Sequence, residues 1–220
     1  MLHTNTLARS FAVACAFMAS LAGAQPVAPA ARLTPAAAIS SADSSAADGP
    51  GALGRGEVAS ALRKGGYVIY FRHTSTDFSK TDAGMNNYSD CANQRLLSEA
   101  GRQAAREIGQ RIEALKLPAD EVIASPMCRT MDTARQMFRS VTPNNALREG
   151  DSGDYPGLKA LLAAPVSPGS NRWLVGHGTP FRAVAGAPHL AEGEAAVLKP
   201  EGTRWRVVAR LQPQDWAALK

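Results

Sequence analysis

The sequence predicts an α/β domain folded as a three-layer α/β/α sandwich with a mostly parallel central sheet. Short, continuous apolar segments typical of buried strands alternate with segments in which apolar residues recur at helical spacing. This alternation favours a sheet with helices on both faces. The length of 220 residues suits one ordinary domain.

The first expected elements are a short helix, a strand and a long loop. Residues 57–64 carry apolar side chains at helical spacing, and two glycines end the helix. Residues 67–71, with the sequence YVIYF, form the first strand. Residues 75–93 are polar and rich in turn-forming residues, and a loop of this length in a compact domain indicates a role facing the substrate.

The middle of the chain predicts a long helix, a strand and a second helix. Ser98 caps the long helix, whose apolar stripe runs from Ala104 to Leu115. Residues 122–125 form the second strand. Residues 130–138 again show the spacing of a helix.

The last third of the chain is less regular. Residues 141–171 contain one expected helix, near 158–163, and residues 173–175 are the third buried strand. Residues 197–199 and 205–210 form a terminal pair of strands joined by a Pro-Glu-Gly turn.

The bulk properties are those of a soluble globular protein. The chain is 45% hydrophobic and 20% charged, with a formal net charge of +5. A charge of this size attracts anionic ligands only weakly. There is no run of Lys or Arg, so we expect no nucleic-acid partner.

Residues 1–24 have the features of a secretory signal peptide. Arg9 precedes a short apolar run that ends in the small-x-small cleavage site Ala22-Gly23-Ala24. The run is too short to span a bilayer stably, so we expect a periplasmic or secreted protein without stable membrane insertion after cleavage; an uncleaved anchor is the alternative. Residues 25–56, rich in Ala, Pro, Ser and Gly, are expected to be a disordered linker before a folded domain at 57–220.

Export would leave two cysteines in the mature protein. Cys15 departs with the signal peptide, and Cys91 and Cys128 remain. An even pair in an oxidising compartment predicts a disulfide, with two buried free thiols as the alternative.

Each of the three expected buried strands is followed by a cationic or imidazole side chain. Arg72 and His73 follow the first strand, Arg129 follows the second, and His177 lies between two glycines after the third. In open α/β sheets ligands bind at the carboxyl ends of strands, so these side chains should form one cationic pocket suited to a phosphoryl group. The flanking glycines would let the backbone of His177 approach a ligand closely.

The residue types suit phosphoryl chemistry. An imidazole is a competent nucleophile toward phosphorus, and a guanidinium group matches phosphate oxygens. Arg129 falls in the first turn of a helix, where the macrodipole disfavours a cation unless an anion binds there. Taken one at a time, Arg72, His73 and Arg129 are equally well explained as surface arginines or a structural histidine, and a lone histidine between glycines, such as His177, is more often structural.

The motifs that contain these residues resemble the histidine phosphatase superfamily, also called the phosphoglycerate mutase-like family. They occur in family order and cover most of Tyr67 to Gly178: RHT at 72–74, LSEAGRQA at 97–104, SPMCRT at 125–130 followed by Thr133-Ala134, and VGHG at 175–178. The tail around 192–195 resembles the small exported members.

The resemblance implies a role for each pocket residue. His73 would attack phosphorus and form a phosphohistidine, while Arg72, Arg129 and His177 would hold the phosphoryl oxygens. No metal or other cofactor is implied, because the fixed cations offset the developing charge. Thr74 and Asp77 are further candidates for substrate contact. The expected partner is a small phosphorylated substrate, or a phosphate or sulfate ion.

The resemblance also suggests a proton donor. In the mutase branch, a Glu is followed by glycines four and eight residues later, and Glu149 with Gly153 and Gly157 fits that spacing. The intervening residues are not typical of the branch, so other carboxylates stay open: Asp77, Glu192, Glu194 and Asp151. After His177-Gly178 the chain continues as Thr179-Pro180, without the acidic residue of the phytase branch, which argues against a phytase.

The expected function is therefore a metal-independent phosphomonoester hydrolase, acting in the periplasm or outside the cell. The alternative is a catalytically inactive module that binds phosphate groups in the cell envelope. The residues do not select a substrate.

Overall fold

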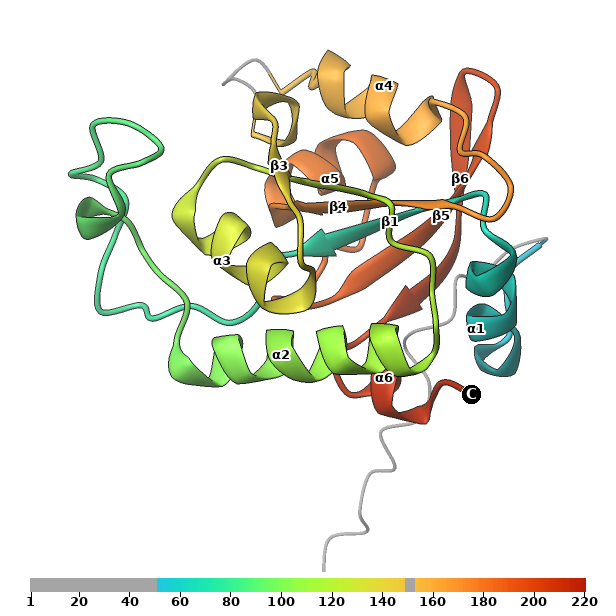
Figure 1. Ribbon diagram of the computed structural model, residues 1–220. Coiled ribbons are helices and arrows are strands. Elements are labelled where there is room, and N and C mark those ends of the chain that lie inside the picture. Colours follow the sequence, from blue (N-terminus) through green and yellow to red (C-terminus); the bar gives the residue numbers. More distant parts are fainter. Residues whose placement is uncertain (1–50, 149–152) are drawn as a thin grey trace, which may run out of the picture. The chain divides into compact units, whose positions relative to one another are not determined.

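The computed structural model describes residues 51–148 and 153–220, which contain a six-stranded mixed sheet (Figure 1). The strand order is β3-β2-β4-β1-β5-β6. The bounds are β1 Tyr67–Arg72, β2 Glu121–Ala124, β3 Thr142–Pro143, β4 Asn171–Gly176, β5 Ala195–Glu201 and β6 Arg204–Leu211. The first four strands of this order are parallel, and β5 and β6 extend the sheet by two antiparallel pairings. The prediction of a mostly parallel sheet is confirmed.

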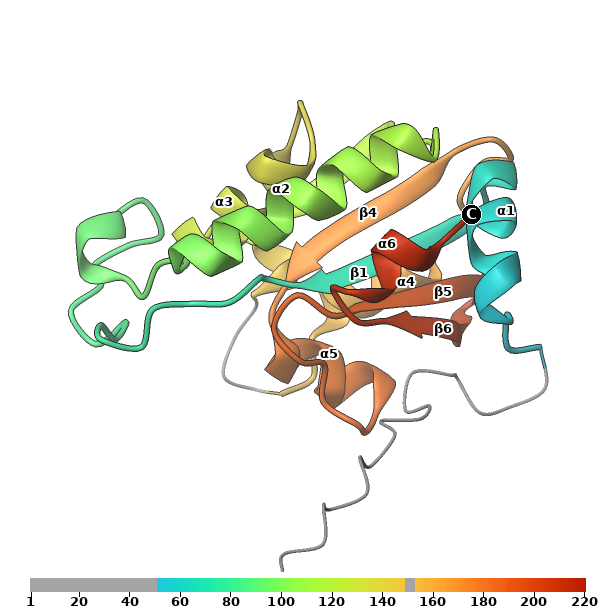
Figure 2. The same ribbon diagram turned by 90° about the horizontal axis from the view of Figure 1, so that it is seen from below.

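Helices cover both faces of the sheet and complete three layers. One face carries α2 (Glu99–Ala114), α3 (Cys128–Met137) and the short α6 (Asp215–Ala218), and α1 (Arg55–Lys64) joins the same apolar cluster. The other face carries α4 (Pro156–Ala163) and α5 (Gly178–Ala185). Figures 1 and 2 show α2 and α5 on opposite sides of the strands.

The central strand β1 shows why both faces are covered. Ile69 and Phe71 pack into the cluster under α2 and α3, whereas Val68 and Tyr70 pack into the cluster under α4 and α5. Successive side chains of a strand point to opposite faces, so a strand with no polar position requires two apolar layers.

The long helix α2 begins where its cap was predicted. The Ser98 hydroxyl accepts the Gly101 N–H at 3.0 Å. The buried stripe contains Ala105 and Ile108, whereas Ala104, expected in the stripe, is only half-buried. A Cβ at Gly109 would lie 2.7 Å from the Met137 Cα, so this glycine is what allows α2 and α3 to pack closely.

Several elements differ from the sequence prediction. β3, α5 and α6 were not predicted, and β4 begins two residues earlier than expected. Its extra residue Asn171 is fully buried because its side chain accepts the Tyr67 N–H and donates to the Leu62 carbonyl oxygen. A polar residue satisfied in this way carries no apolar signal.

Most of the N-terminal segment, for which the sequence predicts a signal peptide and a linker, lies outside the residues that the structure describes. The expected signal peptide, 1–24, and most of the expected linker, 25–56, lie outside the described residues. α1 begins at Arg55, two residues before the expected start of the domain. Within 51–148 and 153–220, no helix has the length and apolar character needed to cross a bilayer.

Candidate active site

The parallel strands bring three chain segments to one edge of the sheet. β4 lies between β1 and β2 and is parallel to both. Their carboxyl ends therefore meet, and the residues that follow them are neighbours. The His73 N–H donates to the Gly176 carbonyl oxygen at 3.0 Å, which joins the first and third of these segments directly.

The four side chains selected from the sequence surround one pocket. Arg72, His73, Arg129 and His177 all line a pocket of about 410 Å³. The rings of His73 and His177 lie edge to face, with their centroids 5.6 Å apart. Cationic side chains and two imidazoles around one pocket can bind an oxyanion and present a nucleophile to it.

His73 is held as a neutral imidazole. Its Nδ1 lies 2.9 Å from the Thr74 carbonyl oxygen, which can only accept a hydrogen bond. Nδ1 therefore carries the proton, and Nε2 keeps its lone pair. Burial is the main cause that lowers the pKa of His73 to about 3, and the charges of Arg129 and Arg72 act in the same direction. At neutral pH the ring is therefore uncharged, and the lone pair on Nε2 is available to act as a nucleophile.

Two buried hydroxyl groups hold His177, one at its ring and one at its backbone. Ser125 Oγ lies 2.8 Å from Nε2 of the ring, and the Tyr70 hydroxyl both donates to the His177 carbonyl oxygen and accepts the His177 N–H, each at 2.9 Å. Burial lowers the pKa of His177 well below its usual value, so this ring is also neutral. When Ser125 donates to Nε2, the proton stays on Nδ1, which can then donate to a bound anion.

The two glycines beside His177 make room for side chains. A Cβ at Gly176 would overlap the Tyr70 hydroxyl, and a Cβ at Gly178 would overlap the His189 ring. Close side-chain packing therefore requires both glycines. Gly178 also lines the pocket, and the approach of this backbone to a ligand stays a prediction.

Arg72 is oriented from the chain before β5. It donates to the Leu190 carbonyl oxygen at 2.9 Å and pairs with Glu192 at 3.4 Å. Its Nε is buried and has no hydrogen-bond partner among the described residues.

Arg129 is oriented by the long loop. It is 6% exposed, and its Nη1 lies 3.1 Å from both carboxylate oxygens of Asp82. The anion expected beside this cation at the start of α3 is thus supplied by the protein itself. Asp82 was not identified from the sequence, because the loop contains several equivalent acidic residues.

Thr74 and Asp77, the other candidates for substrate contact, do not line the pocket. Thr74 is buried, and its N–H donates to Thr133 Oγ1 at 3.2 Å. This contact helps to fix the Thr74 carbonyl oxygen that accepts the hydrogen bond from His73. Asp77 is exposed and accepts the Ser79 N–H at 2.9 Å, which lowers the pKa of its carboxyl group.

The candidate proton donors lie in different places. Glu149 and Asp151 lie outside the described residues, although Arg148, which directly precedes Glu149, lines the pocket. Glu192 accepts hydrogen bonds from Thr76 and pairs with Arg72. Glu194 is buried and pairs with Arg210 at 2.7 Å. Of the carboxylates that the structure describes, none lines the pocket.

Further residues line the pocket that sequence reasoning missed: Arg95, Arg148, Tyr155, Thr179 and His189. They come from irregular segments or the start of a helix, where no periodic pattern marks them. The residues described also contain no group of three or more His, Cys, Asp or Glu side chains placed to hold a metal ion.

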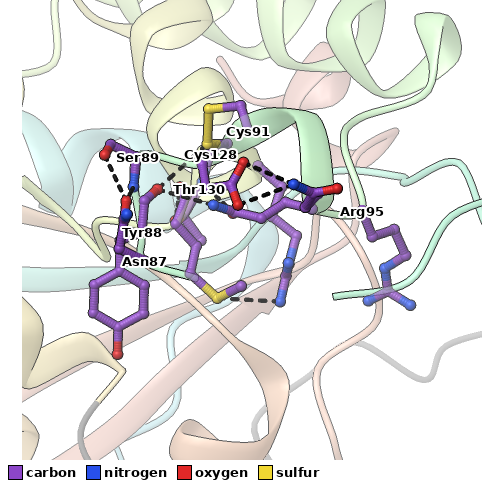
Figure 3. The surroundings of a disulfide bond; sticks show 12 residues. Asn87, Tyr88, Ser89, Cys91, Arg95, Cys128 and Thr130 are labelled. Atoms are coloured by element: carbon purple, nitrogen blue, oxygen red, sulfur yellow. Dashed lines mark hydrogen bonds between the residues drawn. A yellow bond between two sulfur atoms is a disulfide. The ribbon is translucent and has the colours of Figure 1, made fainter. Parts of the chain in front are cut away.

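A disulfide between Cys91 and Cys128 ties the long loop to the start of α3, as the sequence predicted (Figure 3). Cys128 directly precedes Arg129. Gln94 reinforces the junction, because its side chain accepts the Cys128 N–H and donates to the Tyr88 carbonyl oxygen, each at 2.9 Å. The loop that carries Asp82 is thus anchored beside the arginine that Asp82 pairs with.

The low pKa of His73 predicts an acid-sensitive fold. Below the ordinary pKa of 6.5 the unfolded chain takes up a proton that folded His73, with a pKa of about 3, does not. Stability is then full above 6.5 and falls as the pH drops, with a limiting slope of about 1.4 kcal/mol per pH unit for one group.

Urea unfolding at pH 6.5 and roughly pH 5, above most carboxylate titration, measures this slope. His73→Gln should show a smaller loss over the same interval. Equal losses in the wild type and the variant would refute the assignment.

Comparison with known proteins finds a family model that matches this chain. The family model of the histidine phosphatase superfamily (branch 1) matches residues 68–186, just over half of the chain. The matched segment includes all four pocket residues selected from the sequence. A search of curated proteins returned no match.

Several solved structures are similar to this chain at low sequence identity. SixA from Agrobacterium tumefaciens is 21% identical with a TM-score of 0.49, covering 67% of this chain and 99% of that one. The protein histidine phosphatase SixA complexed with tungstate is 17% identical with a TM-score of 0.48, covering 68% and 98%. The mycobacterial glucosyl-3-phosphoglycerate phosphatase Rv2419c, complexed with VO3, is 17% identical with a TM-score of 0.47, covering 66% and 98%.

Proposed function

Because the chain belongs to the histidine phosphatase superfamily and is a phosphatase of that type, we propose that it is a metal-independent phosphomonoester hydrolase that forms a phosphohistidine on His73. The observation that carries this proposal is the neutral His73, with Nε2 unprotonated, in a pocket that it shares with Arg72, Arg129 and His177.

The geometry supports a two-step reaction. Nε2 of His73 attacks phosphorus, the N–P bond forms, and the bond to the leaving oxygen breaks as that oxygen takes a proton. Arg72, Arg129 and Nδ1–H of His177 hold the other phosphoryl oxygens and offset their charge. Water then attacks phosphorus and gives a proton to the donor that was deprotonated in the first step, the N–P bond breaks, and phosphate leaves with His73 restored.

The basic test is hydrolysis of p-nitrophenyl phosphate by the purified protein in the presence of a chelator. Release of phosphate well above a His73→Ala control is expected. A panel of phosphomonoesters on which the wild type and this control do not differ would reject the proposal.

We propose Glu149 as the proton donor. Glu149→Gln should lower turnover of an alkyl phosphate by about 10²–10⁴-fold, because the alkoxide is a poor leaving group without a proton. Turnover of p-nitrophenyl phosphate, whose leaving group needs little protonation, should change far less.

The rival Asp151→Asn variant is measured in parallel. If Asp151→Asn shows this dependence on the leaving group and Glu149→Gln does not, the donor is Asp151.

A phosphate-binding module without turnover is the second candidate. It is favoured by the lack of a carboxylate among the pocket residues that the structure describes. Rapid quenching with a radiolabelled phosphoester decides between the two. A phosphoryl adduct on His73 supports the hydrolase, and binding without an adduct supports the module.

We also propose that the protein is exported. The sequence of residues 1–24 has the pattern of a signal peptide, and the Cys91–Cys128 disulfide suits an oxidising compartment. Fractionation of the producing cells and N-terminal sequencing test this. A mature chain outside the cytoplasm that starts at Gln25 is expected, and an unprocessed cytoplasmic chain would reject it.

A further inference from the structure

The pocket is lined by more arginine side chains than the two assigned to the phosphoryl group that is removed. Besides Arg72 and Arg129 it is lined by Arg95 and Arg148. Arg72 pairs with Glu192, and Arg129 pairs with Asp82. Neither Arg95 nor Arg148 forms an ion pair with any residue in the described part of the chain.

Arg95 is held at the pocket from two directions. Its backbone N–H donates to Asp82 Oδ1 at 2.9 Å, which ties it to the carboxylate that also binds Arg129. Its guanidinium lies 4.6 Å from the centroid of the Phe78 ring. Phe78 is 70% exposed, so the ring supports the cation rather than filling the core.

The Arg95 guanidinium is also short of acceptors. Its Nε is buried and finds no hydrogen-bond partner within the described residues. A buried donor without a partner is unfavourable, and an anionic ligand that accepts its hydrogen bond would remove that cost.

The charges act on one another across the pocket. The positive charge of Arg95 contributes to lowering the pKa of His73, Arg72 and Arg129. The charge of Arg148 acts in the same direction on the pKa of Arg129 and His177. Like charges in one site are unfavourable, and a bound anion beside Arg95 and Arg148 would offset their repulsion. The pocket volume of about 410 Å³ also falls in the range of small-molecule sites.

We propose that Arg95 and Arg148 form a second anion subsite, and that the preferred substrates carry a second phosphate group beyond the phosphoryl group that is removed. This inference rests on the proposed function, because it assigns the phosphoryl group that is removed to His73, Arg72, Arg129 and His177.

Competitive inhibition of p-nitrophenyl phosphate hydrolysis tests the subsite with two probes. Inorganic phosphate carries one anionic group, and methylenediphosphonate carries two joined groups that cannot be hydrolysed apart. The wild type should bind the diphosphonate at least about tenfold more tightly than phosphate, as expected for one additional hydrogen bond to a charged group. Arg95→Gln and Arg148→Gln should each reduce this ratio severalfold or more.

Arg139→Gln is the matched control, because the Arg139 side chain is 95% exposed and, among the residues that the structure describes, pairs only with surface Glu113. It should keep the wild-type ratio. The subsite is overturned if the wild type binds both probes equally, or if all three variants give the same ratio. If Arg95→Gln does not fold, Arg148→Gln carries the test.

Failure of the second anion subsite can be distinguished from failure of the proposed hydrolase activity. If p-nitrophenyl phosphate is not hydrolysed, both probes are measured by calorimetry instead. Tighter binding of the diphosphonate then supports the subsite while the hydrolase is rejected. Turnover with no preference between the probes supports the hydrolase and rejects the subsite.

Discussion

Replacing His73 by alanine is expected to lower turnover of p-nitrophenyl phosphate by at least about 10⁴-fold. Removal of a covalent nucleophile eliminates the reaction path and not merely one contact. Steady-state kinetics at saturating substrate measure the loss, and rapid quenching should detect no phosphoryl adduct.

The interpretation depends on an intact pocket in the variant. His73 is only 2% exposed, so alanine leaves a cavity, and His73→Gln provides a second variant closer in size. Both variants should still bind inorganic phosphate, because Arg72, Arg129 and His177 remain. A variant that binds phosphate and keeps turnover within tenfold of the wild type would show that His73 is not the nucleophile.

Replacing Cys91 and Cys128 together by alanine is expected to lower the free energy of unfolding by about 4 kcal/mol. The two cysteines are 37 residues apart in sequence, and a cross-link of that span restricts the unfolded chain by about this amount in the chain-entropy model. Urea unfolding of the wild type and the double variant at one pH measures the difference.

Reduction of the wild-type protein is the independent control. Reduced and alkylated wild type should show a similar loss, whereas the double variant should not respond to reductant. Equal unfolding midpoints in oxidised and reduced wild type would show that the cross-link does not stabilise the fold.

The regular elements that the sequence predicted are those with an uninterrupted apolar pattern. β1 and α2 fill their pattern almost completely, and both were located to within a residue or two. α5 was missed because it begins with Gly-Thr-Pro, although Phe181, Val184 and Ala185 have helical spacing. β3 has only two residues and forms by pairing with β2, so no local pattern can reveal it.

The pocket residues also divide into those that the sequence predicted and those that it did not. His73, Arg129 and His177 follow strand ends, where the fold class itself indicates a ligand site, so they could be selected in advance. Arg95 comes from a polar loop and reaches the pocket only through tertiary contacts, and Asp82 of the same loop contacts the pocket residue Arg129. Nothing in the local sequence separates Asp82 from Asp77, which is exposed.

A hydrolase must release its product as readily as it accepts its substrate. Arg129 already contacts a carboxylate fixed to the protein, since both oxygens of Asp82 lie 3.1 Å from its Nη1. In the proposed reaction, inorganic phosphate formed in the pocket would share this arginine with a tethered competitor whose effective concentration does not fall. We therefore expect the loop to limit product inhibition, and the ion pair that orients the arginine to promote the departure of phosphate.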